Sequence, residues 1–303
     1  MKPIGVLIMA YGTPSTPDDV EAYYTRIRYG RAPTPEQLAD LVRRYNAIGG
    51  TSPLAQRTAD QVNAIGAALE VAAPGAFDVR FGSKYEPPLL EATAESFRRD
   101  GFERVIGLAL APHSSSMSTD QYMNRARAAL GDGVAFEAIG AWWEAPGFLE
   151  LIARRVLEAL DTIDPQRRAT TEVLFSAHSL PQKILAQGDS YPQQLRDSAQ
   201  RCAELAHVAN WDIAWQSAGR TADPWIGPDI LEVLRTKQRE GITDVVSCPI
   251  GFVSDHLEVL FDLDIEAMAV ADEIGLHLVR TASLNDDPQF MAVLADVIRT
   301  AAT

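Results

Sequence analysis

Residues that could carry acid–base or metal chemistry gather in two segments of this chain. The first, 176–181, reads Ser-Ala-His-Ser-Leu-Pro and places His178 directly after an apolar run typical of a strand. An imidazole at the end of a strand can act as a base near neutral pH or as a metal ligand. The alternative is a histidine whose hydrogen bonds serve only the fold, and the residues alone leave both interpretations open.

The second segment is an acidic stretch that ends at Glu266. Glu258, Asp262 and Glu266 recur every four residues, which places them on one face of a helix expected over 256–271. Like charges at this spacing destabilise a helix by about 0.2–0.5 kcal/mol per pair. Carboxylates hold hydrated divalent cations loosely, so the stripe suits a path for a metal ion. A solvated polar helix face is the alternative, and the spacing taken alone favours it.

A local positive excess lies in the first fifth of the chain, although the net charge is −14. Its arginines and tyrosines precede a Gly-Gly-Thr-Ser-Pro turn at 49–53, and they are Arg26, Arg28, Tyr29, Arg31, Arg43, Arg44 and Tyr45. Arginine forks bind carboxylates bidentately, so this patch suits a ligand with several carboxylates. The sequence has neither a GxxxxGK[ST] loop nor a GxGxxG after its first strand, which disfavours nucleotide and dinucleotide binding.

Hydroxyl side chains crowd the segment 111–119, which reads Ala-Pro-His-Ser-Ser-Ser-Met-Ser-Thr and precedes an expected helix. Such groups cap helix N-termini and bind anions. Capping accounts for one or two of the serines and leaves the others without a role.

Composition limits the remaining classes of protein. The 303 residues are 47% hydrophobic and 22% charged, which suits a globular enzyme of one or two domains. The strongly negative net charge disfavours nucleic acid as a partner. Cys202 and Cys248 are too few for a four-cysteine zinc site or an iron–sulfur cluster, and we expect no disulfide between them. No stretch is apolar enough for a signal peptide or a bilayer span, so we expect a cytoplasmic protein.

Short apolar runs alternate with helical patterns along the chain. The expected strands are 4–10, 77–82, 105–111, 135–138, 172–177, 212–216, 244–249 and 277–280. The expected helices are 35–46, 52–70, 89–100, 119–130, 147–160, 193–208, 226–240, 256–271 and 288–300. This alternation predicts an α/β fold with parallel sheets that helices cover on both faces. The expected boundary between the two halves is 142–146.

The two halves also resemble each other in sequence. Two pairs of segments align: 6–14 with 173–181, and 101–106 with 241–246. The first alignment makes Tyr11 equivalent to His178, each just past the carboxyl end of a strand, where α/β sheets bind ligands. Two such sheets facing each other would place these side chains on opposite walls of one cleft. Chance similarity between two strands is the alternative.

Six motifs resemble, in order along the chain, those of the ferrochelatase family. They are Ala10-Tyr11-Gly12-Thr13-Pro14, Tyr45 through Leu54, Ala111-Pro112-His113, Ser176 through Pro181, Trp215-Gln216-Ser217, and Pro249 through Glu258. They are most similar to those of the bacterial coproporphyrin III ferrochelatases. The resemblance implies two similar Rossmann-like domains, 1–144 and 145–303, with a porphyrin cleft between them. It also implies a porphyrin-gripping insertion at about 26–58 and a C-terminal helix that packs back on the first domain.

The resemblance implies a lyase that inserts Fe²⁺ into a porphyrin in haem biosynthesis and releases two protons. Iron is then the substrate, and neither an iron–sulfur cluster nor a nucleotide is implied. Coproporphyrin III is the expected porphyrin, with protoporphyrin IX as the alternative. Alternatives of other classes are a non-catalytic porphyrin or haem carrier and a bilobal sugar-binding protein. We expect a monomer with no nucleic-acid partner and no stable membrane insertion.

The resemblance also assigns site residues. It places His178 and Glu258 beside the pyrrole nitrogens as catalytic and metal-binding groups, and Tyr11 on the opposite face as an axial ligand of iron. Asp262 and Glu266 would form the approach path of the metal. The residues implied to bind porphyrin are Tyr11, Arg28, Arg31, Arg44, Ser52, Lys84 and Tyr122.

Two residues depart from the pattern of the family. Tyr29 stands where a second adjacent arginine is expected, and Tyr85 stands where a histidine is expected.

Overall fold

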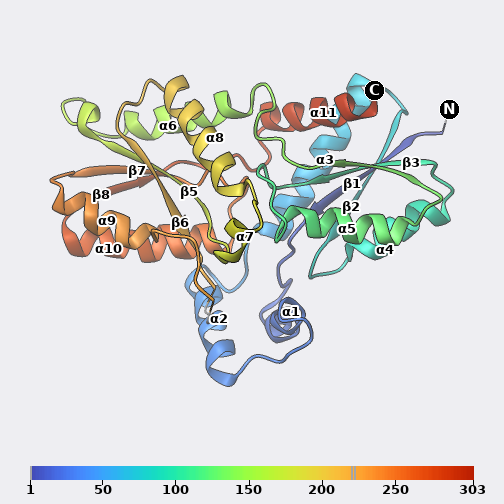
Figure 1. The fold of residues 1–303 in the computed structure, drawn as a ribbon, viewed down its shortest axis with the longest axis horizontal. Coiled ribbons are helices and arrows are strands. Elements are labelled where there is room, and N and C mark those ends of the chain that lie inside the picture. Colours follow the sequence, from blue (N-terminus) through green and yellow to red (C-terminus); the bar gives the residue numbers. More distant parts are fainter. Residues whose placement is uncertain (1, 220, 222) are drawn as a thin grey trace.

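The chain forms two lobes, each built on a four-stranded parallel sheet (Figure 1). The computed structural model describes residues 2–219, 221 and 223–303. The sheet of the N-terminal lobe has the order β2-β1-β3-β4, with β1 (Ile4–Ala10), β2 (Phe77–Ser83), β3 (Arg104–Ala109) and β4 (Ala135–Ile139). The sheet of the C-terminal lobe has the order β6-β5-β7-β8, with β5 (Glu172–His178), β6 (Trp211–Gln216), β7 (Asp244–Cys248) and β8 (His277–Arg280).

The two sheets share one strand order, which confirms the predicted α/β fold of two similar halves. β1 and β5 occupy the same place in their sheets, and each pairs in parallel with the strand on either side. Tyr11 directly follows β1, and His178 is the last residue of β5. Both residues therefore lie at the carboxyl ends of their sheets, as the internal repeat predicts.

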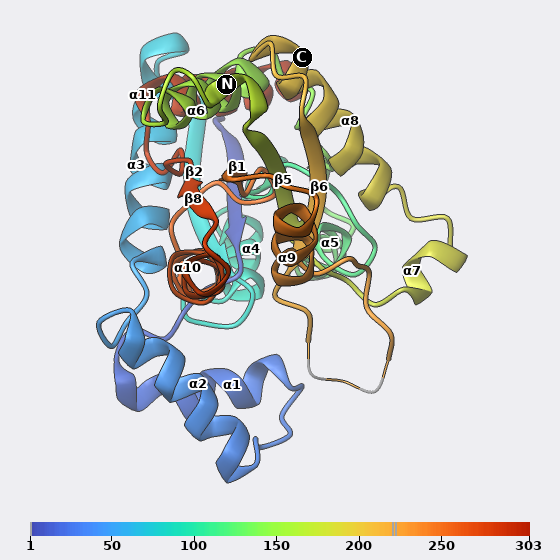
Figure 2. The same cartoon turned by 90° about the vertical axis from the view of Figure 1, so that its left-hand side faces the viewer.

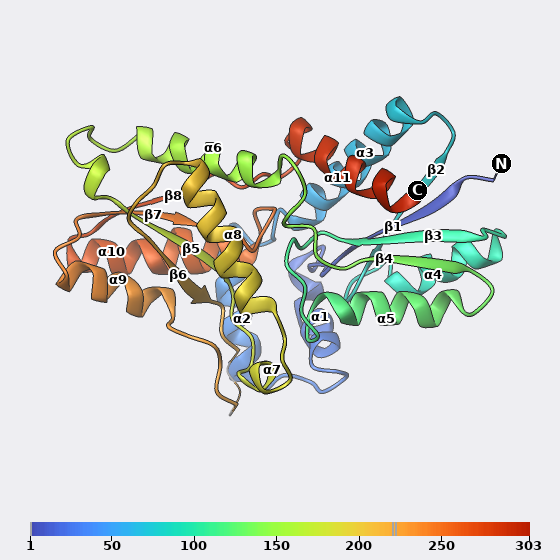
Figure 3. The ribbon, with the colours of Figure 1, turned by 45° about the horizontal axis from the view of Figure 1, so that its top comes forward.

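Helices cover both faces of the two sheets because the central strands are apolar on both faces. In β1, for example, Val6, Leu7, Ile8 and Met9 are all completely buried. One helical layer contains α3 (Leu54–Ala72), α6 (Phe148–Asp161), α8 (Tyr191–Leu205) and α11 (Pro288–Ala302) (Figures 1 and 3). The other contains α4 (Leu90–Arg99), α5 (Thr119–Leu130), α9 (Ile230–Arg239) and α10 (Met268–Ile274).

The hydrophobic core under the first helical layer is continuous between the lobes. Val6 of β1, Phe148 of α6, Phe175 of β5 and Phe290 of α11 belong to one buried cluster. Under the second layer each lobe has a separate cluster of its own. The core under the first helical layer therefore joins the two lobes, whereas the core under the second layer is divided into one part for each lobe.

The C-terminal helix α11 lies on the N-terminal lobe, beside α3 (Figure 3). The Arg104 guanidinium, at the start of β3, donates to the carbonyl oxygens of Ala301 and Ala302 at 2.6 and 2.7 Å. These carbonyls belong to the last turn of α11, where backbone acceptors lack helical partners and favour a cation. The domain boundary at 144/145 stays a prediction, since chain from both sides of it builds the N-terminal lobe.

Two helices project from the N-terminal lobe between β1 and α3 (Figures 1 and 2). They are α1 (Val20–Ile27), which follows a short 3₁₀ turn η1 (Pro17–Asp19), and α2 (Pro35–Ala47). Thr34 and Gln37 cap the start of α2 reciprocally, and Pro35 stands in its first turn. The sequence predicted α2 but not α1, in which only Val20 and Tyr23 are buried.

Other differences from the predicted elements are local. The expected helix over 256–271 forms, but its middle part is a π-helix, η3 (Val259–Ala267), which runs into α10. The short elements η2 (Arg168–Thr170) and α7 (Lys183–Ala186) were not predicted. Among the described residues, no helix combines the length and the hydropathy that a membrane crossing requires.

Candidate functional site

His178 and Glu258 lie against each other at the carboxyl end of the C-terminal sheet. His178 Nε2 is 3.4 Å from Glu258 Oε1. On the other side of the ring, Nδ1 makes a short hydrogen bond to the carbonyl oxygen of Ser179. A carbonyl can only accept, so Nδ1 carries a proton, and Nε2 is the ring nitrogen that faces Glu258.

Close packing of the loop after β7 positions Glu258. A Cβ added to Gly251 would come within 2.5 Å of the Ala177 Cβ, so this loop passes directly over the end of β5. Gln216, the last residue of β6, donates from Nε2 to the Glu258 carbonyl oxygen at 3.4 Å. His256 Nε2 lies 3.5 Å from the second carboxylate oxygen, Oε2. Two imidazoles therefore flank one carboxylate.

The members of this pair change each other's pKa. Burial opposes charge on His178, but the Glu258 carboxylate outweighs it and raises the pKa of His178 to about 9. Burial also opposes charge on Glu258, yet His178 and His256 hold the pKa of Glu258 well below its usual range. At neutral pH the free protein therefore holds an imidazolium–carboxylate pair. The two side chains are 32% and 36% exposed, so solvent reaches the pair.

The acidic stripe continues from Glu258 into η3. Asp262 is buried, accepts a short hydrogen bond from Ser217 Oγ, and lies 3.3 Å from Nη1 of Arg44 in the N-terminal lobe. Burial and the charge of Glu258, with a smaller effect of Glu266, raise the pKa of Asp262 to about 6. Backbone hydrogen bonds in a π-helix join residues five apart, so side chains four apart still share one side. The raised pKa indicates that Ser217 and Arg44 compensate the Asp262 charge only in part, so a nearby cation would stabilise the carboxylate.

A second cluster lies beyond the end of β1 in the N-terminal lobe. The Tyr11 ring packs edge-on against Tyr85 with ring centres 4.8 Å apart. The Lys84 ammonium lies 5.9, 5.2 and 5.1 Å from the ring centres of Tyr11, Tyr85 and Tyr122 and donates to Gln121 Oε1 at 2.6 Å. Among the described residues, no carboxylate pairs with Lys84, which is buried.

Burial lowers the pKa of Lys84 to about 8, and the nearby Arg125 charge acts in the same direction. Most of the Lys84 population is still an ammonium at neutral pH. A buried cation with aromatic and amide neighbours but no anion is set to receive an anion from outside the chain.

Electrostatic effects link the two clusters between the lobes. Burial and neighbouring Tyr85 raise the pKa of Tyr11 well above its usual value, and the Glu258 carboxylate of the other lobe adds to this. The Tyr11 phenol is therefore neutral in the free protein. Protein atoms surround Tyr11, yet 42% of the residue is accessible to solvent, as expected for a side chain that lines an open site.

The remaining predicted porphyrin-binding residues lie in or next to the projecting helices. Arg28 and Arg31 follow α1, and each guanidinium donates to the carbonyl oxygen of the other at 3.3 Å. Ser52 is buried just before α3, and its hydroxyl accepts from the Leu54 amide at 3.2 Å. Among the described residues, Arg28, Arg31 and Ser52 make no direct contact with the His178 pair, whereas Arg44 reaches Asp262.

Comparison with known proteins identifies the family. The family model described as ferrochelatase matches residues 3–302. This chain belongs to the ferrochelatase family. A ferrochelatase of Herpetosiphon aurantiacus is 45% identical over 97% of this chain and 97% of that protein. A coproporphyrin III ferrochelatase of Geobacillus kaustophilus is 44% identical over 98% of this chain and 95% of that protein.

Membership in the ferrochelatase family confirms the predicted activity. The chain is a lyase that inserts iron into a porphyrin in haem biosynthesis, and Fe²⁺ is its substrate. The solved structure of CbiX, described as the terminal enzyme of siroheme biosynthesis in denitrifying bacteria, has a TM-score of 0.60 at 17% identity and covers 99% of this chain and 100% of that one. SirB from Bacillus subtilis with Fe³⁺ has a TM-score of 0.56 at 11% identity, with 99% and 96% covered. These structures confirm the chelatase-like fold.

Several residues around this ferrochelatase site received no role from sequence reasoning. Gln216 holds the Glu258 carbonyl, and Ser217, whose φ is +60°, turns its hydroxyl toward Asp262. The motif at 215–217 is recognisable in the sequence, but the sequence does not indicate that its residues position Glu258 and Asp262. Strand order is the signal that could have found it, because β6 neighbours β5 and its last residues must therefore lie beside His178.

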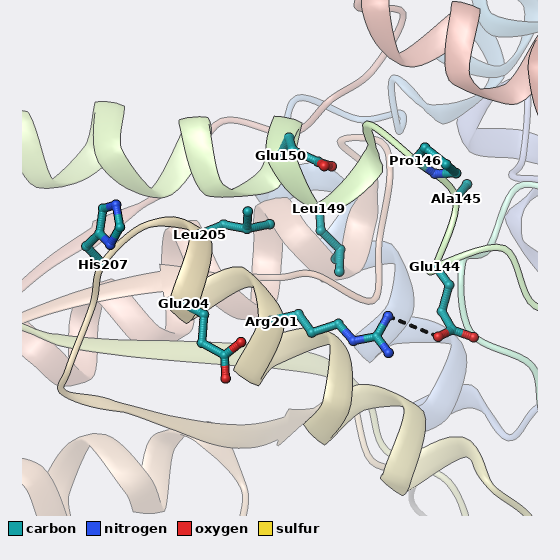
Figure 4. A pocket seen from close by; sticks show the side chains of 9 residues that line it. All are labelled: Glu144, Ala145, Pro146, Leu149, Glu150, Arg201, Glu204, Leu205 and His207. Atoms are coloured by element: carbon teal, nitrogen blue, oxygen red, sulfur yellow. Dashed lines mark ion pairs between the residues drawn. The ribbon is translucent and has the colours of Figure 1, made fainter.

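A cavity of about 590 Å³ lies elsewhere, on the outer face of the ferrochelatase fold between α6 and α8 (Figure 4). Glu144, Glu150 and Glu204 line it together with His207 and with Arg201, which pairs with Glu144 at 3.0 Å. Three carboxylates against one arginine repel a ligand that itself carries carboxylates. None of the residues predicted to bind porphyrin or metal lies in this cavity.

Proposed function

We propose that this chain inserts Fe²⁺ into coproporphyrin III, with His178 and Glu258 on one side of the ring and Tyr11 on the other. The observation that carries the assignment of the site is the His178–Glu258 pair at 3.4 Å; the exposed Tyr11 of the other lobe, whose pKa the Glu258 charge raises, supports it. Named coproporphyrin III ferrochelatases at 41–44% identity support the choice of porphyrin.

Cationic side chains of the N-terminal lobe would bind the propionates. Lys84 is buried and lacks a carboxylate partner among the described residues, so it can compensate one propionate directly. Arg28 and Arg31 use one donor each on backbone carbonyls and keep other guanidinium N–H groups for a ligand. Four propionates need more cations than two, which favours coproporphyrin III over protoporphyrin IX.

Metal insertion forms bonds from four ring nitrogens to iron and releases the protons of two pyrrole N–H groups. In our proposal, the approach of hydrated Fe²⁺ expels the Nε2 proton of the His178 imidazolium to solvent, and the neutral ring, whose Nδ1 proton stays bonded to Ser179, then accepts a pyrrole proton on Nε2. Glu258 accepts it in turn, because it already contacts Nε2, and its second oxygen lies beside His256. Ring bending that exposes the nitrogen lone pairs would draw about 1–5 kcal/mol from propionate binding.

Asp262 and Glu266 would guide hydrated Fe²⁺ to the pair. Asp262 has a pKa of about 6, so it is mostly a carboxylate at neutral pH and can bind an arriving cation. Tyr11 would approach the iron from the other face. Its phenol is neutral in the free protein, so it acts as a phenol donor before iron binds and can become a tyrosinate only on the metal.

We further propose a cytoplasmic monomer of two domains, 1–144 and 145–303, with the porphyrin-gripping insertion at about 26–58. Cys202 and Cys248 are both buried, and burial raises their pKa values, which disfavours thiolate ligation of an iron–sulfur cluster. The absence of a phosphate-binding glycine loop from the sequence supports activity without a nucleotide.

The test is anaerobic Fe²⁺ supplied with coproporphyrin III or protoporphyrin IX in parallel, followed by the visible spectrum. We expect faster metallation of coproporphyrin III, and equal or faster protoporphyrin IX turnover would contradict that choice. His178→Ala should bind porphyrin without metallating it, whereas Glu273→Gln, an exposed change in α10, should behave as wild type. If the wild-type protein binds porphyrin but inserts no iron, it would instead be a porphyrin carrier.

A further inference from the structure

The serine-rich loop after β3 reaches from the N-terminal lobe to the start of α8 in the other lobe. Ser115 Oγ donates to Asp189 Oδ2 at 2.9 Å, and Ser116 donates to the same oxygen from Oγ at 2.7 Å and from its amide at 2.8 Å. Three donors on one carboxylate oxygen form a strong, charge-assisted contact. We call Ser115, Ser116 and Asp189 the serine latch.

This contact explains the excess of hydroxyl groups in the segment 111–119. Thr119 Oγ1, at the start of α5, accepts from the Ser115 amide at 2.9 Å and so ties the loop to the helix. The hydroxyls of Ser115 and Ser116 are instead used by Asp189. The anion that the sequence pattern favours is therefore a carboxylate of the chain itself.

Asp189 also organises the first turn of α8. Its other oxygen, Oδ1, accepts from the Tyr191 amide at 2.9 Å. Burial opposes charge on Asp189, but the hydrogen bonds from Ser116 and from the Tyr191 amide outweigh it and lower its pKa. Asp189 is thus a stable anion that joins the loop of one lobe to the helix start of the other.

Tyr191, the first residue of α8, connects the serine latch to His178. Its hydroxyl donates to the His178 carbonyl oxygen at 3.0 Å, and its ring is buried against Trp215 with centres 5.7 Å apart. The pairing of β5 with β7 ends at Phe175, so β7 offers no partner to the His178 carbonyl. The Tyr191 hydroxyl supplies the hydrogen bond that a longer β7 could otherwise donate to this carbonyl.

We propose that the serine latch and Tyr191 are positioning residues that fix the peptide of His178 and thereby hold its imidazole against Glu258. The proposal rests on the catalytic role of His178 proposed above. Loss of the Tyr191 hydroxyl frees the His178 carbonyl, and the imidazole, which is attached through the Cα and Cβ of the same residue, can then shift with the backbone. Because misplacement of a reacting group by about 1 Å can cost about a hundredfold in rate, a partial release should cost about tenfold.

The experiment compares single-turnover insertion of Fe²⁺ into coproporphyrin III with the Kd of the porphyrin, measured by quenching of protein fluorescence. Tyr191→Phe and Asp189→Asn should each lower the insertion rate about tenfold and change the Kd less than twofold. Asp197→Asn is the matched control on α8, since within the described part of the chain Asp197 accepts a hydrogen bond from Gln193 of the same helix and from no residue of the other lobe. It should leave both quantities unchanged.

A second control tests whether the loss of any hydrogen bond between the lobes slows insertion, or only the loss of those that lead to His178. Ser198 lies farther along α8, where its hydroxyl contacts His113 of the N-terminal lobe at 2.8 Å. Ser198→Ala should lower Tm but not the insertion rate at 25 °C. An equal rate loss in Ser198→Ala and Asp189→Asn would overturn the proposal in favour of adhesion.

A double-mutant cycle completes the test. If Asp189 and Tyr191 act through the same carbonyl, the double variant should be about as slow as either single variant, not about a hundredfold slower. Wild-type rates in Tyr191→Phe, with His178→Ala inactive, would overturn the latch proposal and leave the proposed function standing. An active His178→Ala would overturn both.

Discussion

Replacement of Glu258 by glutamine isolates the charge that controls His178. The variant keeps the size of the side chain and removes only the carboxylate. His178 Nε2 is 3.4 Å from Glu258 Oε1, a separation at which two unit charges interact by about 1.2 kcal/mol in water and by about 5 kcal/mol at an effective dielectric constant of 20.

Because about one-third of each side chain is exposed, the water-like end of this interval applies. An interaction of about 1.2 kcal/mol corresponds to about 0.9 pKa units, which is the smallest shift we expect. We therefore expect Glu258→Gln to lower the pKa of His178 from about 9 toward its ordinary value of 6.5.

Histidine NMR of the free protein measures this directly, because the chain has five histidines and His178→Gln identifies the resonance. Glu273→Gln, which removes an exposed carboxylate of α10, is the control and should leave the titration in place. A His178 pKa that stays within about 0.3 units of wild type in Glu258→Gln would refute the geometry of the pair.

The same variant makes a prediction about stability. The pKa of His178 is raised in the fold, so its stabilisation is complete below about pH 6.5 and is lost as pH rises through about 9. The pKa of Glu258 is lowered, so its stabilisation is present above its ordinary value of 4.5 and is lost as pH falls below that. The unfolding free energy of wild type relative to Glu258→Gln should therefore decline between pH 6.5 and 9. A difference that grows over this interval would contradict the assignment.

Three further substitutions test other parts of the structure. Lys84→Met should weaken porphyrin binding at least about tenfold in a quenching titration, since a hydrogen bond to a charged group contributes about 1.5–3 kcal/mol, and it should not lower Tm, because it removes a buried charge. Asp262→Asn should raise the KM for Fe²⁺ and leave the porphyrin Kd unchanged, and the opposite pattern would place Asp262 outside the metal path. Arg104→Ala removes two bonds to the last carbonyls of α11 and should cost about 1–2 kcal/mol of stability in denaturant unfolding; turnover at 25 °C should be retained.

The strands were the most predictable part of this fold. β1 and β8 have the predicted bounds, and β1 shows the reason most clearly, because an apolar run of seven residues fits a buried parallel strand. The helix α1 was not predicted, because it buries only Val20 and Tyr23 and its sequence lacks a strong apolar stripe. The π-helix was not predicted either, because a four-residue spacing of acids fits both helix types.

The site was predictable where a motif carried it and hidden where the fold assembled it. His178 and Glu258 each stand in a recognisable motif, and the structure brings them together. The contact of Asp262 with Arg44 spans 218 residues of chain, and that of Ser116 with Asp189 spans 73. Such pairs depend on how the two sheets face each other, and local spacing carries no information about that.

The position of α11 determines when this chain can finish folding. The helix covers the sheet that β1 begins, and its Phe290, Met291 and Leu294 are buried in the core that both lobes share. Synthesis must therefore pass residue 298 before the first lobe can seal its apolar surface. Until then the nascent N-terminal half has an exposed hydrophobic surface that chaperones can bind. A fragment truncated before Pro288 would expose this surface permanently.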